Sequence, residues 1–182
     1  MGRIIRNSIA YIRGFLYRFK VFFNSGRTIG LKVRIFLSAA IDFDRGANVV
    51  IESGVKIRER VNLSVRRNAT LIINSKASIG MDNKIVCHDR IVIGEGTLLS
   101  PNVLVYDHDH FFDKQIGVHR KEFLSEPIEI GKNCWIGANT VILKGTKLGD
   151  NCVVGAGSII KGSFPSNTLI VQKRFTEISE VR

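Results

Sequence analysis

A short segment near the middle of the chain concentrates the side chains best suited to acid–base chemistry. Residues 107–110 read Asp-His-Asp-His and lie within a polar, charged stretch, residues 106–127. Histidine suits a general base because its unperturbed pKa of about 6.5 lies near physiological pH. Either Asp107 or Asp109 could orient a neighbouring imidazole and stabilise its charged form. The residues alone leave open which carboxylate does so, and they also allow an ordinary solvated loop tip.

A strict six-residue repeat flanks this segment on both sides. From Ile130 the chain reads IGKNCW, IGANTV, ILKGTK, LGDNCV and VGAGSI, and an aliphatic residue opens each unit. Upstream, IGEGTL and LSPNVL at residues 93–104 follow the same pattern, and looser copies begin near residue 40. A period of six fits neither an α-helix nor the two-residue alternation of an ordinary strand. It predicts short strands joined by corners and stacked into a β-helix, with one aliphatic side chain per unit pointing inward.

The units IGEGTLLSPNV, CWIGANTVIL and VVGAGSII, with the histidine-bearing segment between them, resemble the hexapeptide-repeat acyltransferases. Within that family the chain is similar to galactoside and maltose O-acetyltransferases and to O-acetyltransferases of bacterial surface polysaccharides. The resemblance covers residues 70–165. It implies a mainly β fold, a left-handed parallel β-helix of triangular coils. It also implies acetyl-CoA as co-substrate and a homotrimer with active sites between subunits.

The resemblance places the catalytic histidine on the extruded segment between the two repeat tracts. Counting the family's spacing of seventeen residues from Ile93 gives His110, and a count back from Trp135 also favours His110 over His108. The family often places an asparagine near the acceptor pocket, and Asn83 is its counterpart here.

The resemblance also maps the CoA contacts onto residues of the second repeat tract. Small residues at Ala138 and Ala156 would let the pantetheine arm lie along the coils, and Trp135 would cover part of the cleft. Lys161 and Arg174 are expected to reach phosphates of the nucleotide end. The segment around Arg174, LIVQKRFTEIS, departs from the Gly-x-Pro-Ala-Lys-like close that the family commonly has.

Composition and charge bound the function classes. The 182 residues are 45% apolar with 17 glycines, which describes one folded domain with many tight turns. The net charge is +11, and residues 1–41 hold eight Lys or Arg and no Asp or Glu. Such a basic end is attracted to anionic surfaces. No helix-turn-helix or stacking aromatics accompany it, so we expect no nucleic-acid binding. Three cysteines without zinc or redox spacing fit a cytoplasmic protein.

The N-terminal segment has the period of an amphipathic helix. If residues 3–23 are helical, one face carries Ile5, Ile9, Ile12, Leu16, Phe19 and Phe23. Basic residues interrupt every apolar run, which argues against a signal peptide and against a membrane-spanning helix. Two interpretations remain open. The helix lies on the inner face of the cytoplasmic membrane, or it docks on its own domain or on a neighbouring subunit.

The sequence thus predicts three parts: residues 1–36, a basic amphipathic segment; residues 37–165, the β-helix with its loop at 106–127; and residues 166–182, a tail. The predicted reaction moves an acetyl group from acetyl-CoA to a saccharide hydroxyl in surface polysaccharide biosynthesis, without a metal. One alternative is an N-acetyltransferase acting on an amino sugar. Another resembles the γ-type carbonic anhydrases, with His108, His110 and either His88 or His119 binding a metal. A third is an inactive membrane-associated scaffold.

Overall fold

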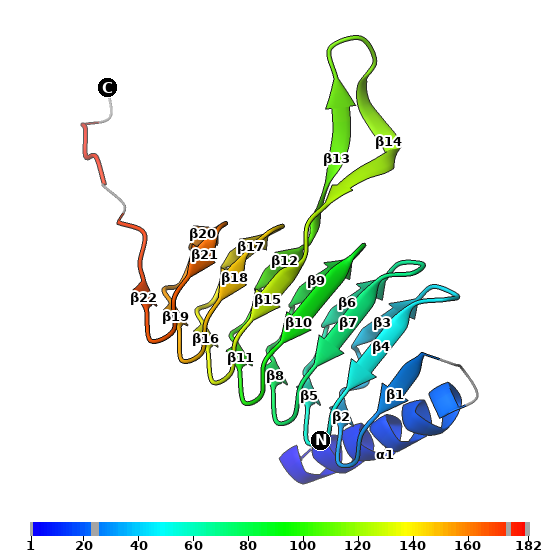
Figure 1. Cartoon of the computed structure of the whole chain (residues 1–182). Helices are drawn as coiled ribbons and strands as arrows, with labels where there is room; N and C mark the ends of the chain where they lie inside the picture. Colours follow the sequence, from blue (N-terminus) through cyan, green and yellow to red (C-terminus); the bar gives the residue numbers. More distant parts are fainter. Residues whose placement is uncertain (1, 23–25, 174–175, 181–182) are drawn as a thin grey trace.

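A computed structural model describes residues 2–22, 26–173 and 176–180 of the chain (Figure 1). One helix, α1 (Arg3–Phe22), precedes a solenoid of short parallel strands. In the described residues the strands form two seven-stranded parallel sheets, one six-stranded parallel sheet and a two-stranded antiparallel pair. The mainly β repeat fold predicted from the six-residue period is confirmed.

The three parallel sheets, called A, B and C here, are the faces of the coils. Sheet A contains β1 (Arg27–Ile29), β4 (Asn48–Ile51), β7 (Thr70–Ile73), β10 (Arg90–Ile93), β15 (Ile128–Ile130), β18 (Lys147–Leu148) and β21 (Ser163–Phe164). Sheet B contains β2 (Arg34–Ile35), β5 (Lys56–Ile57), β8 (Ser78–Ile79), β11 (Leu98–Leu99), β16 (Trp135–Ile136), β19 (Val153–Val154) and β22 (Leu169–Ile170). Sheet C contains β3 (Ala40–Phe43), β6 (Asn62–Val65), β9 (Lys84–Cys87), β12 (Leu104–Tyr106), β17 (Val141–Leu143) and β20 (Ile159–Ile160).

The register of these sheets explains the period of six. Ile93 pairs with Ile130, and Ile130 pairs with Leu148 on the next coil, so equivalent aliphatic residues stack in columns. The inward residues that the sequence predicted are all buried: Ile130, Ile136, Ile142, Leu148, Val154 and Ile160. Because each coil covers the one before it, the columns merge into one continuous apolar core.

The corners of the coils need residues that tolerate tight backbone. A Cβ on Gly94 would lie 2.2 Å from the carbonyl oxygen of Gly131 on the next coil, so only glycine fits there. Asparagine takes the left-handed turn positions at other corners, as at Asn102 and Asn139, both with φ of 57°. Close stacking and tight turns thus account for the glycine and asparagine content of the repeat.

The coils extend beyond residues 37–165 at both ends. β1 and β2 already pair in register with β4 and β5, so the first coil begins at Arg27, and β22 continues sheet B to Ile170. Ile29, Ile35 and Ile41 do keep the period of six. The first coil was missed because cations are frequent around these residues and Val33 replaces the small residue of the first unit.

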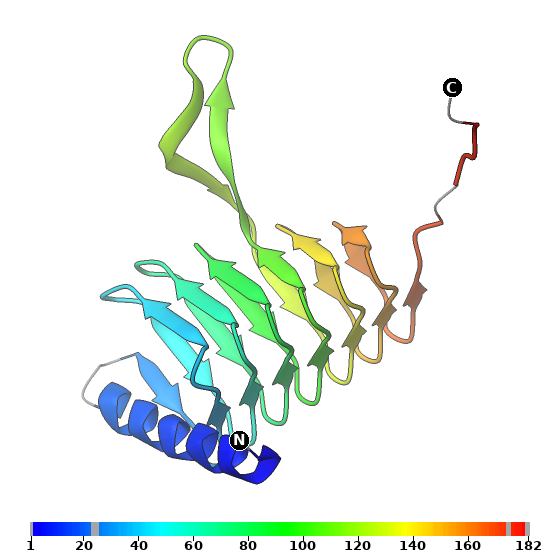
Figure 2. The ribbon, with the colours of Figure 1, turned by 180° about the vertical axis from the view of Figure 1, so that it is seen from behind.

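The segment that breaks the period projects from the solenoid as a β-hairpin. β13 (His108–Asp113) and β14 (Gly117–Ser125) pair antiparallel between the end of β12 and the start of β15 (Figures 1 and 2). The extruded segment was predicted in the right place, and its backbone groups satisfy one another through strand pairing. The hairpin therefore stands on the corner between sheets C and A.

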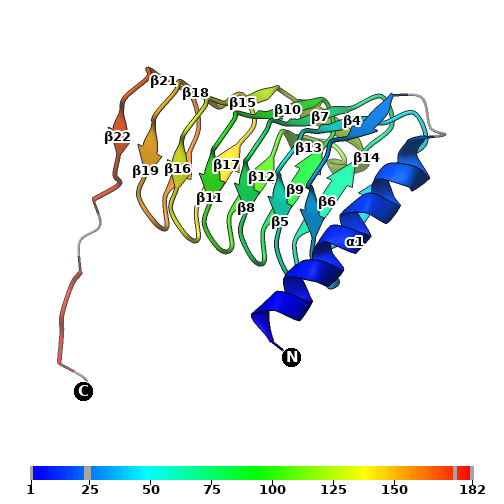
Figure 3. The ribbon, with the colours of Figure 1, turned by 90° about the horizontal axis from the view of Figure 1, so that it is seen from below.

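Helix α1 lies across the first coil and covers that end of the solenoid (Figure 3). Ala10 and Val21 are buried, and a Cβ on Gly14 would lie 2.1 Å from the carbonyl oxygen of Val33. Arg13 fastens the contact by donating hydrogen bonds to the carbonyls of Phe36 and Ala39. The helix therefore docks on its own domain.

The docked face is not the apolar face predicted from the sequence. The side chains of Ile5, Ile12, Leu16 and Phe19 are 51–63% exposed, whereas Ile9 is half-buried. Phe23 lies outside the described residues. No helix of the described residues is long and apolar enough to cross a membrane. The helix thus packs largely through residues outside the predicted face, including Tyr17, and leaves most of the large apolar side chains of that face in solvent.

Candidate active site at the hairpin base

Asp107 anchors the base of the hairpin. Its side chain is fully buried, and its two carboxylate oxygens accept hydrogen bonds from the backbone amides of His88 (2.8 Å) and Asp89 (2.8 Å). The Nδ1 atom of His108 lies 3.2 Å from Oδ1. Burial alone would raise the pKa of Asp107, but the hydrogen bonds from His108 and from the two amides outweigh it and lower the pKa. The carboxylate is therefore ionised and holds His108 in place.

Two histidine rings stack beside this carboxylate. The rings of His88 and His108 are nearly parallel, with centroids 3.7 Å apart. Burial, and then the nearby His108, lower the pKa of His88 from 6.5 to about 4. His88 is therefore neutral at physiological pH, so no charge on His88 opposes the close stacking of the two rings.

Phe123 of β14 gathers three histidines around one aromatic ring. Its centroid lies 4.3 Å from that of His88, 5.4 Å from that of His108 and 4.7 Å from that of His110. His110 is exposed to solvent, whereas His108 is largely covered. We call His88, His108, His110 and Phe123 the histidine cluster. Of its three imidazoles, that of His110 is the one exposed to solvent, beside the partly exposed ring of Phe123.

Lys144 ties the hairpin to the next coil. It is buried, and its ammonium group donates to the carbonyl of Leu124 (3.1 Å). The same group pairs with Asp109 (3.3 Å) and Glu126 (3.5 Å). The sequence had left open whether Asp107 or Asp109 orients a histidine. In the structure Asp107 pairs with His108, whereas Asp109 pairs with Lys144.

Lys144 and Phe123 were not among the site residues predicted from the sequence. One signal was present, because ILKGTK is the unit of the second repeat tract whose second residue is not glycine, and Lys144 directly follows that departure. That unit adjoins the hairpin base. Phe123 gave no such signal, since its position follows from the register of the hairpin, in which it pairs with His110.

Asn83 lies inside the coil. It is fully buried, and its Oδ1 accepts a hydrogen bond from the amide of Val103 on the next coil (2.5 Å). Its Nδ2 is buried without a hydrogen-bond partner. The side chain thus takes a packing position inside the coil, and its predicted place near an acceptor stays a prediction.

Three of the predicted CoA contacts, Trp135, Ala138 and Ala156, lie away from the hairpin corner. Trp135 is 53% exposed on sheet B, and its indole Nε1 donates to Ser100 (3.0 Å). Ala138 and Ala156 stack at the corner between sheets B and C, where the amide of Gly157 donates to the carbonyl of Ala138 (2.7 Å). Lys161 is exposed at the other corner, between sheets C and A, and Arg174 lies outside the described residues.

The structure therefore brings the predicted acid–base residues together and places Trp135, Ala138 and Ala156 of the predicted CoA set away from them. Asp107, His108 and His110 meet at the corner between sheets C and A. Trp135, Ala138 and Ala156 follow sheet B and its corner with sheet C. Among the residues that the structure describes, no three His, Cys, Asp or Glu side chains form a metal-binding group.

Sequence comparisons agree with this architecture. A family model described as the hexapeptide repeat of succinyl-transferase matches residues 127–161. WbbJ of Escherichia coli (strain K12), which its name assigns to lipopolysaccharide biosynthesis as an O-acetyl transferase, is 29% identical over 159 residues, or 83% of this chain and 77% of that protein. The chain therefore carries the hexapeptide repeat over residues 127–161 and is similar over most of its length to an O-acetyl transferase of this repeat type. Galactoside O-acetyltransferase of the same organism is 33% identical over 68% of this chain, which spans only 57% of that protein.

Solved structures of low sequence identity share the fold. AntD, an N-acyltransferase from Bacillus cereus solved with dTDP and 3-hydroxybutyryl-CoA, superposes with a TM-score of 0.70 at 19% identity, over 86% of this chain and 83% of that one. The polySia specific acetyltransferase NeuO superposes with a TM-score of 0.66 at 20% identity, over 81% of this chain and 70% of that one. At these identities the similarity shows that the fold is shared and nothing further.

Proposed function

We propose that this hexapeptide-repeat acyltransferase moves an acetyl group from acetyl-CoA to a hydroxyl of a saccharide, with His110 as general base. The observation that carries the proposal is the accessible imidazole of His110, which rests on Phe123 beside the buried pair of Asp107 and His108. The relatives named for O-acetyl transfer to lipopolysaccharide and galactosides support the choice of a saccharide.

The chemistry asks little beyond a base and a means of stabilising the oxyanion. His110 takes the proton of the acceptor hydroxyl as its oxygen attacks the thioester carbonyl. The tetrahedral oxyanion then collapses, the carbon–sulfur bond breaks, and His110 returns its proton to the departing CoA thiolate. The products are the acetyl ester and CoA. His108 and Asp107 act as positioning residues, because they fix the surface on which His110 and Phe123 pack.

The separation of the two predicted sets supports a homotrimer. The histidine cluster and the CoA set of Trp135, Ala138 and Ala156 lie at different corners of one chain. A second copy that presents its sheet B to the hairpin would complete a site that one chain leaves divided. We therefore propose that each active site forms between two subunits.

Release of CoA from acetyl-CoA in the presence of sugars and lipid-linked glycans tests the reaction. We expect His110→Ala to lower the rate by about 10²–10⁴-fold, the usual contribution of a general base, with an unchanged unfolding midpoint. His108→Gln should cost less, since it acts through orientation. A folded His110→Ala variant with full activity would remove His110 as the base, and complete loss in His108→Gln alone would transfer that role to His108.

One structural neighbour favours a second candidate reaction. AntD is named as an N-acyltransferase, so an amino sugar is the alternative acceptor. Mass spectrometry of the product, before and after mild alkali, separates the two reactions, because alkali cleaves an acetyl ester and leaves an acetamide intact. A product that is stable to alkali would overturn the O-acetyl assignment.

We also propose that the protein is cytoplasmic and binds the inner face of the membrane through α1. The exposed apolar side chains of the helix, with basic residues along its border, support this location. Fractionation of cells that express the full chain tests it. Recovery with the membranes is expected for the native chain, and recovery in the soluble fraction is expected for Leu16→Glu. Equal distribution of the two would contradict the proposal.

A further inference from the structure

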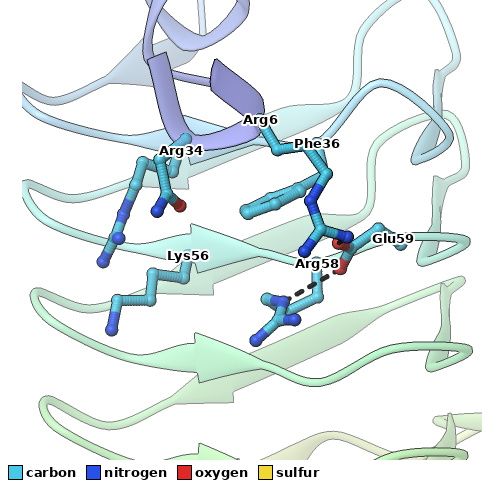
Figure 4. A pocket seen from close by; sticks show the side chains of 7 residues that line it. Arg6, Arg34, Phe36, Lys56, Arg58 and Glu59 are labelled. Atoms are coloured by element: carbon cyan, nitrogen blue, oxygen red, sulfur yellow. Dashed lines mark hydrogen bonds and ion pairs between the residues drawn. The ribbon is translucent and has the colours of Figure 1, made fainter. Parts of the chain in front are cut away.

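A basic pocket lies between the start of α1 and the first two coils (Figure 4). Its volume is about 220 Å³, below the range of about 300–1,000 Å³ typical of drug-sized ligands. It is lined by Arg6, Asn7, Arg34, Phe36, Lys56, Arg58 and Glu59. A pocket of this size suits a small group such as a phosphate.

The lining of the pocket carries an excess of positive charge. Its one carboxylate, Glu59, lies 2.9 Å from Arg58 and 3.8 Å from Arg6. In the part of the chain that the structure describes, no ion pair involves Arg34 or Lys56. Four cations and one anion leave a net charge of +3 around the cavity.

Glu59 pairs with Arg58 and Arg6, whereas Arg34 is held by an aromatic ring and a neighbouring strand. Arg34 and Lys56 are register partners on β2 and β5, so their side chains extend side by side (Figure 4). The guanidinium of Arg34 lies over the ring of Tyr11, and that of Arg58 lies over the ring of Phe36, each at 5.3 Å. The Nε of Arg34 is buried without a hydrogen-bond partner. A buried donor of this kind calls for an acceptor.

Two apolar grooves continue from the pocket along the helix. The first shares Arg6, Phe36 and Glu59 with the pocket, and it adds Ile9 and Leu37. The second, of about 400 Å³, runs on past Ile9, Ile12, Leu16, Tyr17 and Leu37. Leu37 is 65% exposed and Leu16 is 59% exposed. The surface therefore joins a site for an anion to a site for a hydrocarbon chain.

We propose that this surface binds one anionic phospholipid, with the headgroup phosphate in the basic pocket and an acyl chain along the grooves beside α1. The proposal rests on the membrane association of α1 proposed above, and it adds a specific headgroup site. The predicted CoA site lies elsewhere, since Trp135 is four strands from Arg34 along sheet B, or about 19 Å at the usual strand spacing.

Binding of the full chain to vesicles tests the pocket. Vesicles of phosphatidylcholine alone are compared with vesicles that also contain phosphatidylglycerol, for the native chain and for an Arg34→Gln/Lys56→Gln variant. The matched control is Arg45→Gln/Arg67→Gln, which removes the same charge from exposed sites at the corner between sheets C and A. We expect the pocket variant to bind anionic vesicles about 30-fold more weakly, from about fivefold per cation near a membrane, and the control to change by less than about threefold. Equal weakening in both variants would overturn the proposal.

Two further arms separate this site from the membrane association on which it rests. Leu16→Glu should abolish binding to both kinds of vesicle, whereas the pocket variant should lose only the preference for anionic vesicles. Binding of inorganic phosphate, followed by calorimetry, is expected to be weaker than binding of vesicles. If the native chain bound no vesicles and yet bound phosphate through Arg34, the lipid would be the wrong ligand. If Leu16→Glu instead dissociated an oligomer, the occupant of the grooves would be a second copy.

Discussion

The interior of the coils and the base of the hairpin are packed by different means. Inside the coils a neutral aliphatic residue (Ile, Leu or Val) recurs every six positions, and each one is covered by its equivalent on the next coil. At the hairpin base a buried aspartate, a buried lysine and two stacked imidazoles occupy one corner. Buried charges are costly unless they are paired. The repetitive coils therefore supply the stability that holds this costly but chemically useful cluster in place.

The coil side of the comparison predicts the largest effect on stability. Ile85 is fully buried on β9, directly before the hairpin base in the core columns. Replacement by alanine leaves a cavity, so Ile85→Ala should lower the free energy of unfolding by about 2–5 kcal/mol. Urea unfolding measures this loss. The activity of the folded fraction should stay within about threefold of native. A large loss of rate without loss of stability would show that the coil core contributes directly to catalysis.

The hairpin side predicts a dependence on pH. Burial, and then His108, lower the pKa of His88 to about 4 in the folded chain, whereas an unfolded histidine titrates near 6.5. Between these pH values the unfolded state binds more protons, so stability falls as the pH falls from about 6.5 to about 4. The shift sets an upper limit of about 3 kcal/mol, and partial exposure of the ring lowers it.

Urea unfolding at pH 7 and pH 4.5 measures this dependence. His88→Gln cannot gain the proton, so it should lose less stability than the native chain between the two values. If both proteins lost the same free energy, acid sensitivity would belong to groups outside the histidine cluster.

Lys144 connects the two regions and predicts a local effect. Lys144→Met removes the donor to Leu124 and the cation shared by Asp109 and Glu126. A hydrogen bond from a charged group contributes about 1.5–3 kcal/mol to stability. Because both carboxylates are more than half exposed, we expect the substitution to lower the free energy of unfolding by about 2 kcal/mol. Hydrogen exchange should quicken in β13 and β14 and stay unchanged in the coils. Lys147→Met, at an exposed position of β18, is the matched control and should leave the hairpin protected.

The same contrast explains how far the sequence could lead. The period from Ile130 to Ile160 predicted the coils because each unit repeats one local rule that does not depend on distant residues. It predicted the extruded segment by its own interruption. The sequence could not predict that Asp109 pairs with Lys144 or that Asp107 pairs with His108. These contacts follow from the register of the hairpin and from stacking between coils. The docked face of the helix was predicted wrongly for a related reason. Its strongest apolar face is exposed, and the contact is made by other residues, among them Ala10 and Gly14.

The CoA set of Trp135, Ala138 and Ala156 predicts that a surface of the coils, and not only the hairpin, takes part in function. Ala156 is exposed at the corner between sheets B and C, one coil beyond Ala138. If pantetheine lies there, Ala156→Leu should raise the KM for acetyl-CoA about tenfold, equivalent to about 1.4 kcal/mol, because the larger side chain fills the groove. The kcat and the unfolding midpoint should hardly change, since the side chain is not part of the core. Ala156→Ser, which adds one small atom, is the control and should keep the native KM. An unchanged KM in Ala156→Leu would place the donor on another face and confine the chemistry of this chain to the hairpin corner.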